Sequence, residues 1–119
     1  MRQTIPPVYL TIAAALLPSD AAGHPPAFQV ESEVTVRADS FGCKRTSELD
    51  RLLERNRTGG FTSGTQLYAY LQAHKCIGLT AGRARVYANR GQYVCIYDPI
   101  DNKTKIYPCA WTRRDMLSP

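Results

Sequence analysis

The sequence has little of what metal sites and common catalytic centres are built from. Its two histidines, His24 and His74, lie far apart. No two of its four cysteines have the C-x2-C or C-x4-C spacing of a zinc site. The glycine-rich segment 59–64 lacks the Gly-Lys-Ser/Thr of a phosphate-binding loop. We therefore predict no bound metal, no cofactor and no enzymatic activity.

Long hydrophobic runs are also missing. The longest uncharged, mostly apolar stretch is Val8–Leu17, and ten residues are too few to cross a bilayer of about 30 Å. Arg2 precedes this stretch, Pro18 ends it, and small residues follow up to Gly23. This order is typical of a secretory signal peptide. We predict that residues 1–23 are one, that no membrane span remains after cleavage, and that the protein is periplasmic or secreted. A short core helix is the alternative interpretation.

Acidic residues are outnumbered. Ten Asp and Glu stand against fifteen Lys and Arg, which gives a formal net charge of +5. A basic balance favours acidic partners such as nucleic acid, anionic lipid headgroups or acidic glycans. However, no run of Lys and Arg is longer than two residues. A soluble domain with a mildly basic surface therefore remains the alternative.

The four cysteines predict two disulfides in an oxidising compartment, and three pairings are conceivable. A turn-rich segment separates Cys95 from Cys109. In a hairpin centred near Asn102 these two cysteines would face each other, with Cβ atoms about 4.5–5.5 Å apart and close to bridging distance. Cys43 then pairs with Cys76 by exclusion. Four free buried thiols in a cytosolic protein are the alternative.

The first half of the chain indicates a lead-in and two helices. Residues 24–42 are predicted as an extended lead-in that contains one strand, 28–37, because Val alternates with polar residues there. Leu49, Leu52 and Leu53 share one helical face, with Ser47 as the predicted N-cap and the Gly pair at 59–60 as the stop. A second helix, capped by Ser63, is predicted over 65–75.

The last third has the pattern of short strands. The segments 83–89, 92–97 and 105–111 are rich in β-branched and aromatic residues and are separated by turn signals. Pro108 cannot donate to a β-ladder, so we expect its strand to be an edge strand or to carry a bulge.

Several short motifs resemble small exported bacterial proteins with an SH3-like (SH3b-type) module, over roughly residues 43–117. They are Cys76-Ile-Gly-Leu79-Thr-Ala-Gly82, Arg85-Val-Tyr87, Gly91-Gln-Tyr-Val94-Cys-Ile96, Ile106-Tyr107 and Trp111-Thr112. The resemblance implies a five-stranded barrel and a binding role with cell-wall or protein partners. We therefore expect an α+β fold in residues 43–119: a helical hairpin packed on a small antiparallel SH3-like β-barrel, with two disulfides.

Aromatic and cationic residues interleave on the predicted strands. Such a surface can stack on bases or sugars and attract acidic groups. The predicted ligand-binding residues are Arg83, Arg85, Tyr87, Arg90, Tyr93, Lys105, Tyr107 and Trp111. Tyr97 and Lys103 lie beside them in the sequence. The alternative is that these aromatic residues line the core and the cations only solvate its edge.

We therefore expect a non-enzymatic binding module whose ligand, a protein or a cell-envelope polymer, lies on this aromatic-basic barrel face. One alternative is a structural subunit of a larger envelope or surface assembly that contacts its neighbours through its N-terminal segment. A second is a binder of anionic polymers, nucleic acid or acidic glycan, and a third is a small hydrolase. The hydrolase would need Cys76 as a free thiol with His74 beside it.

Overall fold

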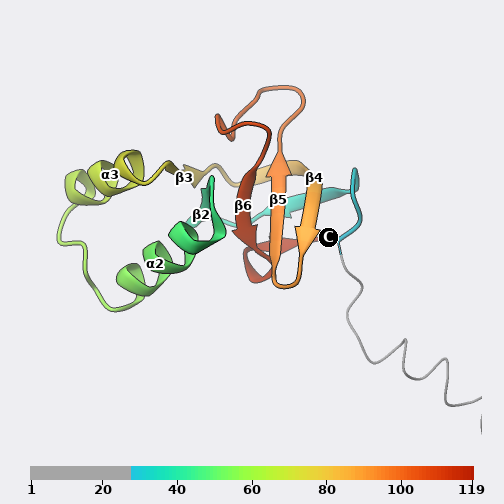
Figure 1. Cartoon of the computed structure of the whole chain (residues 1–119). Coiled ribbons are helices and arrows are strands. Elements are labelled where there is room, and N and C mark those ends of the chain that lie inside the picture. Colours follow the sequence, from blue (N-terminus) through green and yellow to red (C-terminus); the bar gives the residue numbers. More distant parts are fainter. Residues whose placement is uncertain (1–27) are drawn as a thin grey trace, which may run out of the picture.

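The computed structural model describes residues 28–119, which form one antiparallel sheet and two helices (Figure 1). The predicted signal peptide, 1–23, lies outside the described residues. The sheet has seven strands in the order β3-β2-β6-β5-β4-β1-β7. The elements in chain order are β1 (Glu33–Val36), β2 (Ser40–Cys43), α2 (Thr46–Arg57), α3 (Gly64–Ala73), β3 (Cys76–Leu79), β4 (Gly82–Arg90), β5 (Tyr93–Tyr97), β6 (Ala110–Arg113), a 3-10 turn (Arg114–Met116) and β7 (Leu117–Ser118).

The predicted helical hairpin on a small SH3-like barrel is wrong. Strands dominate the fold, and the two helices interrupt a pair of adjacent strands instead of forming a layer on a barrel. β2 pairs with β3 in the antiparallel register Cys43↔Cys76, and residues 44–75 leave the sheet between them. We call residues 44–75 the helical insertion. Figure 1 shows α2 and α3 projecting from the β2–β3 end of the sheet.

The two faces of the sheet pack against different cores. One face, here the inner face, buries Val34, Val86 and Ile96, and Leu79 of the opposite sheet edge packs against the same cluster. The sheet is therefore bent enough for its two ends to share a core. The outer face carries Cys43, which is buried with Leu49 and Leu52 of α2. The helical insertion thus covers one end of the outer face and leaves the rest open.

Gly42 shows how closely the inner face is packed. A Cβ atom added at Gly42 would lie 2.9 Å from the Cβ atom of Ala110 and 3.2 Å from a methyl group of Leu79. A side chain at this position would push neighbouring strands apart. The glycine is therefore required by close approach of backbone to side chains.

Local signals explain the two helices only in part. Ser63 is the N-cap of α3 as predicted, and its Oγ accepts a hydrogen bond from the Gln66 backbone N–H at 3.1 Å. The predicted cap of α2 is wrong: Ser47 lies inside α2, and its N-cap residue, Arg45, makes no side-chain capping bond. Side-chain capping therefore fixes the start of α3 but not that of α2.

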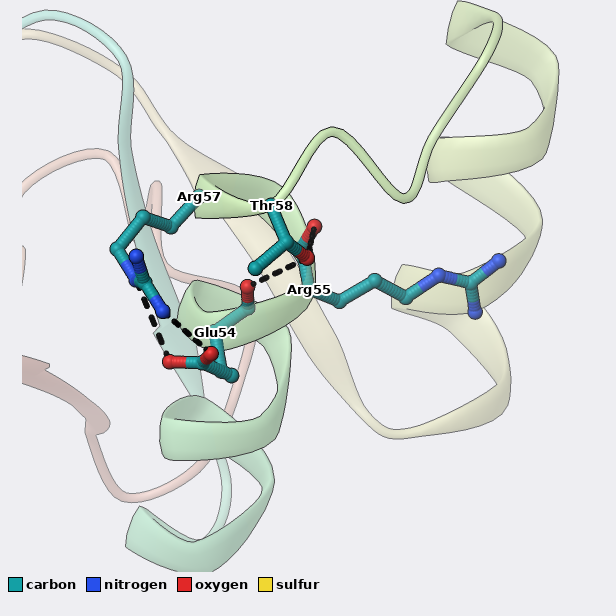
Figure 2. A network of polar contacts seen from close by, with 4 residues as sticks. All are labelled: Glu54, Arg55, Arg57 and Thr58. Carbon is teal, nitrogen blue, oxygen red and sulfur yellow. Dashed lines mark hydrogen bonds and ion pairs between the residues drawn. The ribbon is translucent and has the colours of Figure 1, made fainter.

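The end of α2 is closed by contacts within its last turn (Figure 2). Arg57 forms an ion pair with Glu54 at 2.6 Å, and the Thr58 hydroxyl donates to the carbonyls of Glu54 and Arg55, each at 3.1 Å. Arg55 points the other way, and its guanidinium lies 4.4 Å from the centre of the Phe61 ring. The turn between α2 and α3 is therefore stabilised by polar contacts at the end of α2 and by the contact of Arg55 with Phe61.

Both disulfides are present with the predicted pairing. Cys43 is bonded to Cys76, and Cys95 to Cys109. The expected register of the second pair is wrong, however, because Cys95 lies opposite Trp111. Strand β6 begins only at Ala110, so Cys109 and the preceding predicted strand residues belong to the β5–β6 connection. Within residues 28–119, no helix is both long enough and apolar enough to cross a membrane.

Candidate binding site

A β-bulge decides where the predicted arginines point. β4 and β5 pair as Val86↔Ile96 and then Ala88↔Cys95, so Tyr87 is an extra residue in β4. A bulge of this kind interrupts the alternation of side chains. Arg90, an odd number of residues after Arg85, would otherwise point to the opposite face. The bulge brings both arginines to the outer face.

The four β4 residues Arg83, Arg85, Tyr87 and Arg90 form what we call the cationic outer face. The side chain of Arg83 is 74% exposed, and Tyr87 is 45% exposed. Trp111 of β6 borders this surface, because the guanidinium of Arg90 lies 4.8 Å from the centre of its ring. This geometry is that of a cation–π contact. With Tyr93, which lies opposite Arg90 in the register, six of the eight predicted binding residues are on this side of the sheet.

Glu31, just before β1, and Glu33, the first residue of β1, contact one end of this surface. Arg83 forms an ion pair with Glu33, and Arg85 Nη1 donates to the carbonyl oxygen of Glu31 at 2.8 Å. The hydroxyl of Tyr97 donates to Glu31 Oε1 at 2.6 Å. This hydrogen bond raises the pKa of Tyr97 above its ordinary value of 10.0, because ionisation would place a phenolate beside a carboxylate. Tyr97 therefore stays neutral and acts as a support.

Two aromatic residues of β5 hold the structure together. The Tyr97 ring lies edge-on to Tyr87, with ring centres 5.9 Å apart, and so props up the exposed ring. Tyr93 packs against the core of the helical insertion, and its hydroxyl donates to Asp50 Oδ2 at 2.6 Å. Tyr93 was predicted to bind a ligand. The structure instead places it as a tie between the sheet and α2.

The other two predicted residues, Lys105 and Tyr107, lie away from the cationic outer face, in the β5–β6 connection. A hollow of about 550 Å³ separates this connection from α3 and β3. Helix α3 contributes Tyr68, Leu71 and Gln72 to its walls. Strand β3 and the residue after it contribute Cys76, Ile77, Gly78 and Thr80, and the β5–β6 connection contributes Asp101, Lys103 and Lys105. A second hollow of about 480 Å³ shares several of these residues and adds Lys44, Lys75, Ile106 and Tyr107. We call the two together the β3 groove.

The wall formed by the β5–β6 connection is ordered by Asp98. Its Oδ1 accepts the backbone N–H groups of Ile100 and Asp101, both at 2.9 Å. The bonds from these N–H groups and the nearby charge of Lys103 lower the pKa of Asp98 below its ordinary value of 3.8. Asn102 continues the turn by donating from Nδ2 to the Tyr107 hydroxyl at 2.7 Å. These contacts order the segment that carries Lys103 and Lys105.

The hydrolase hypothesis loses its nucleophile. Cys76 is disulfide-bonded and cannot form a thiolate. His74 stacks on Tyr70 with ring centres 4.1 Å apart, and its Nδ1 lies 3.3 Å from Glu48 Oε1. Among residues 28–119, no three His, Cys, Asp or Glu side chains are grouped so that they could hold a metal ion. His74 is thus a packed helix-end residue.

The β3 groove is the feature that the sequence-based prediction missed. It lies along Cys76–Leu79, which was not predicted to be a strand: the predicted second helix ended at residue 75, and residues 76–82 entered only as a motif resembling the SH3b-type module. A signal was nevertheless present. Ser-Phe-Gly-Cys and Cys-Ile-Gly-Leu both contain glycine and large apolar residues, and the predicted Cys43–Cys76 bond would bring the two segments together. Two such segments tied by a disulfide suggest paired strands.

Comparison with protein-family models, curated protein sequences and solved structures finds no match to this chain. The relationship to exported SH3b-type proteins therefore stays a prediction, and function is argued from the residues themselves.

Proposed function

We propose that this chain is a non-enzymatic binding module of a periplasm or the cell exterior, and that its acidic ligand lies on the cationic outer face. The observation that carries the proposal is the β-bulge at Tyr87, which brings Arg90 to the same side of the sheet as Arg83 and Arg85. Bulges often re-aim a side chain at a functional site. A bulge that gathers three arginines beside two aromatic rings favours recognition over packing.

The acidic residues already at this surface do not block it. The ion pair between Arg83 and Glu33 joins two solvent-exposed side chains, and such pairs stabilise by only about 0–1 kcal/mol. A ligand with carboxylate or phosphate groups can replace Glu33 at little cost. Guanidinium groups bind both kinds of group in a bidentate manner. An acidic protein surface or an acidic envelope polymer fits this chemistry.

The two disulfides support a location outside the reducing cytosol. Disulfides persist in oxidising compartments and are rare in cytosolic proteins. Export by cleavage near residue 21 is part of the proposal. Intact-mass spectrometry of the natural protein tests it, and the expected mass is that of residues 22–119 less four hydrogens. A full-length mass with four alkylatable thiols would contradict both export and disulfide formation.

The binding proposal is tested with a triple variant, R83Q/R85Q/R90Q. The matched control, R37Q/R51Q/R57Q, removes the same charge from exposed arginines elsewhere on the domain. Binding of polyglutamate, an acidic glycan and single-stranded DNA is measured for each protein at several salt concentrations. We expect the first variant to lose about tenfold or more in affinity and the control to change by about twofold or less.

Two results would contradict this function. If both triple variants weaken binding equally, only net charge matters and the cationic outer face is not a site. If none of the three probes binds at about 1 mM, an acidic ligand is excluded. Tightest binding of DNA, with a steep fall in affinity with salt, would favour the anionic-polymer alternative.

A further inference from the structure

The β3 strand ends the sheet on one side and has an unused edge. β3 pairs with β2, and no other strand of residues 28–119 pairs with it. The Lys44 backbone N–H donates to the Lys75 carbonyl at 3.0 Å, which makes these residues a hydrogen-bonded pair. Hydrogen-bonded and non-hydrogen-bonded pairs alternate along antiparallel strands. Cys76 and Gly78 therefore direct their backbone N–H and C=O groups away from β2.

Two features of the register agree with this assignment. Cys43 and Cys76 have their Cα atoms 3.9 Å apart, as expected for a close, non-hydrogen-bonded pair. Gly78, two residues after Cys76, lies opposite Phe41 and is therefore also in a non-hydrogen-bonded pair. The outward backbone groups thus belong to positions 76 and 78, and both residues line the β3 groove.

The groove leaves room for another strand. Its two hollows have volumes of about 550 and 480 Å³. The opposite walls come from α3 and from the β5–β6 connection, with the exposed rings of Tyr68 and Tyr107 at the rim. Strands in a sheet lie about 4.8 Å apart. An extended segment can therefore lie beside β3 between these walls.

The positive charge of the groove determines which side chains a bound segment should have. Four lysines line it: Lys44, Lys75, Lys103 and Lys105. The only carboxylate among its lining residues is Asp101, which already forms an ion pair with Lys103 at 3.3 Å. Within residues 28–119 the other three lysines form no ion pair. The groove therefore complements acidic side chains.

Two of these lysines occupy backbone positions that suit glycine better. Lys75 and Lys105 both have φ of 55°, in the left-handed region. For an L-residue other than Gly, Asn or Asp this conformation is unfavourable. Both residues lie on the same groove. A charged side chain held at an unfavourable backbone position is typical of a functional surface.

We propose that the β3 groove binds an extended acidic peptide segment of another protein by strand addition. The backbone groups of Cys76 and Gly78 pair with the main chain of the peptide, and the lysines contact its carboxylates. Sheet edges bind peptides in this way because an exposed edge offers alternating donors and acceptors. A nucleic acid has no amide backbone to match that alternation. The site is separate from the cationic outer face and does not depend on it.

The probe is a short fluorescein-labelled peptide of alternating Val and Glu. One control peptide replaces Glu by Lys, and a second keeps Glu but carries N-methyl groups on alternate backbone amides. Binding to the whole protein is measured by fluorescence polarisation. We expect the Lys peptide not to bind and the N-methylated peptide to bind at least about tenfold more weakly, because it cannot complete the ladder.

The matched protein variants are K75N/K105N and R37Q/R51Q, whose arginines are exposed and lie outside both proposed sites. Each removes two positive charges, and asparagine tolerates the left-handed backbone. We expect K75N/K105N to weaken peptide binding about tenfold and R37Q/R51Q to change it by about twofold or less. A second readout is amide hydrogen exchange. The Gly78 N–H should become protected on binding, whereas the Ile77 N–H should already be protected in the free protein.

Three outcomes would overturn the inference. They are equal affinity for the N-methylated and unmodified peptides, no change on K75N/K105N, and no binding of the Val–Glu peptide at about 1 mM. The proposed function is tested separately, by the outer-face arginines. Loss of binding in R83Q/R85Q/R90Q alone would place the peptide on the cationic outer face instead.

Discussion

Replacing Cys43 and Cys76 by alanine removes the covalent tie at the base of the helical insertion. The two residues are separated by 33 positions, and a loop of that length in the unfolded chain loses entropy when its ends are linked. The chain-entropy relation gives about 3.7 kcal/mol at 25 °C. The second disulfide closes a separation of 14 and gives about 3.0 kcal/mol. We therefore expect C43A/C76A to be the more destabilising pair.

Packing adds a similar cost for both pairs, because Cys95 and Cys109 are also buried. Cys43 is fully buried and Cys76 nearly so, in one cluster with Leu49, Leu52 and Leu71. Truncation to alanine leaves a small void there in addition to the freed loop. A loss of about 3.7 kcal/mol is a large part of the 5–15 kcal/mol that stabilises an ordinary domain. For a domain of this size it corresponds to a fall in Tm of about 15–30 °C.

The assay is urea unfolding of the oxidised proteins, followed by circular dichroism and extrapolated linearly to water. C95A/C109A is the control. A loss below about 1 kcal/mol for C43A/C76A, or a clearly larger loss for C95A/C109A, would refute the reasoning. Hydrogen exchange locates the effect. In C43A/C76A the amides of α2 and α3 should lose protection by local opening before those of β4 and β5, because the two regions belong to different cores.

Three smaller perturbations test the local structure. Gly42→Ala should cost about 1–3 kcal/mol in urea unfolding by overpacking, whereas Gly78→Ala, which enters open space, should change stability by about 0.5 kcal/mol or less. Ser63→Ala should cost about 1 kcal/mol by loss of the N-cap, and Ser47→Ala, which removes no cap, should cost nothing. The lowered pKa of Asp98 means that its ionised form stabilises the fold above pH 3.8 and that this stabilisation is lost as pH falls through the lowered value. The stability difference between wild type and D98A should therefore be constant near neutral pH and shrink in acid. A difference that grows in acid would contradict the assigned direction of the shift.

The local features of the fold could be predicted from neighbouring residues. Ser63 caps α3 by accepting the backbone N–H of Gln66, three residues later. The sequence signal for the cap therefore lies within one helical turn. The β-branched and aromatic residues of 83–89 and the turn signal that follows them predicted β4 in the same way. The prediction of the N-cap of α2 was wrong because several polar residues lie near the start of this helix, and only packing decides at which of them the helix begins. The prediction missed β2 because four residues, one of them glycine, give too short a pattern.

Register was beyond the reach of the sequence. The hairpin centred near Asn102 predicted the right disulfide partner for Cys95 by assuming that Cys109 lay directly opposite. The structure has Trp111 opposite, and the Cα atoms of the two cysteines are still only 5.4 Å apart. A disulfide tolerates both arrangements because its Cα separation ranges from about 4.4 to 6.8 Å. The cysteine pairing was therefore predictable although the strand alignment was not.

The sequence alone determined the number and pairing of the disulfides, the cap of α3 and the basic charge. These depend on composition and on contacts between near neighbours. Only the tertiary structure decided that the helices interrupt a sheet, that a bulge turns Arg90 to the side of Arg83 and Arg85, and that four lysines meet along the edge of β3. Each of these depends on partners far apart in the chain. In a sheet, a shift of one residue moves a side chain to the other face, so the partner strand decides which residues share a surface.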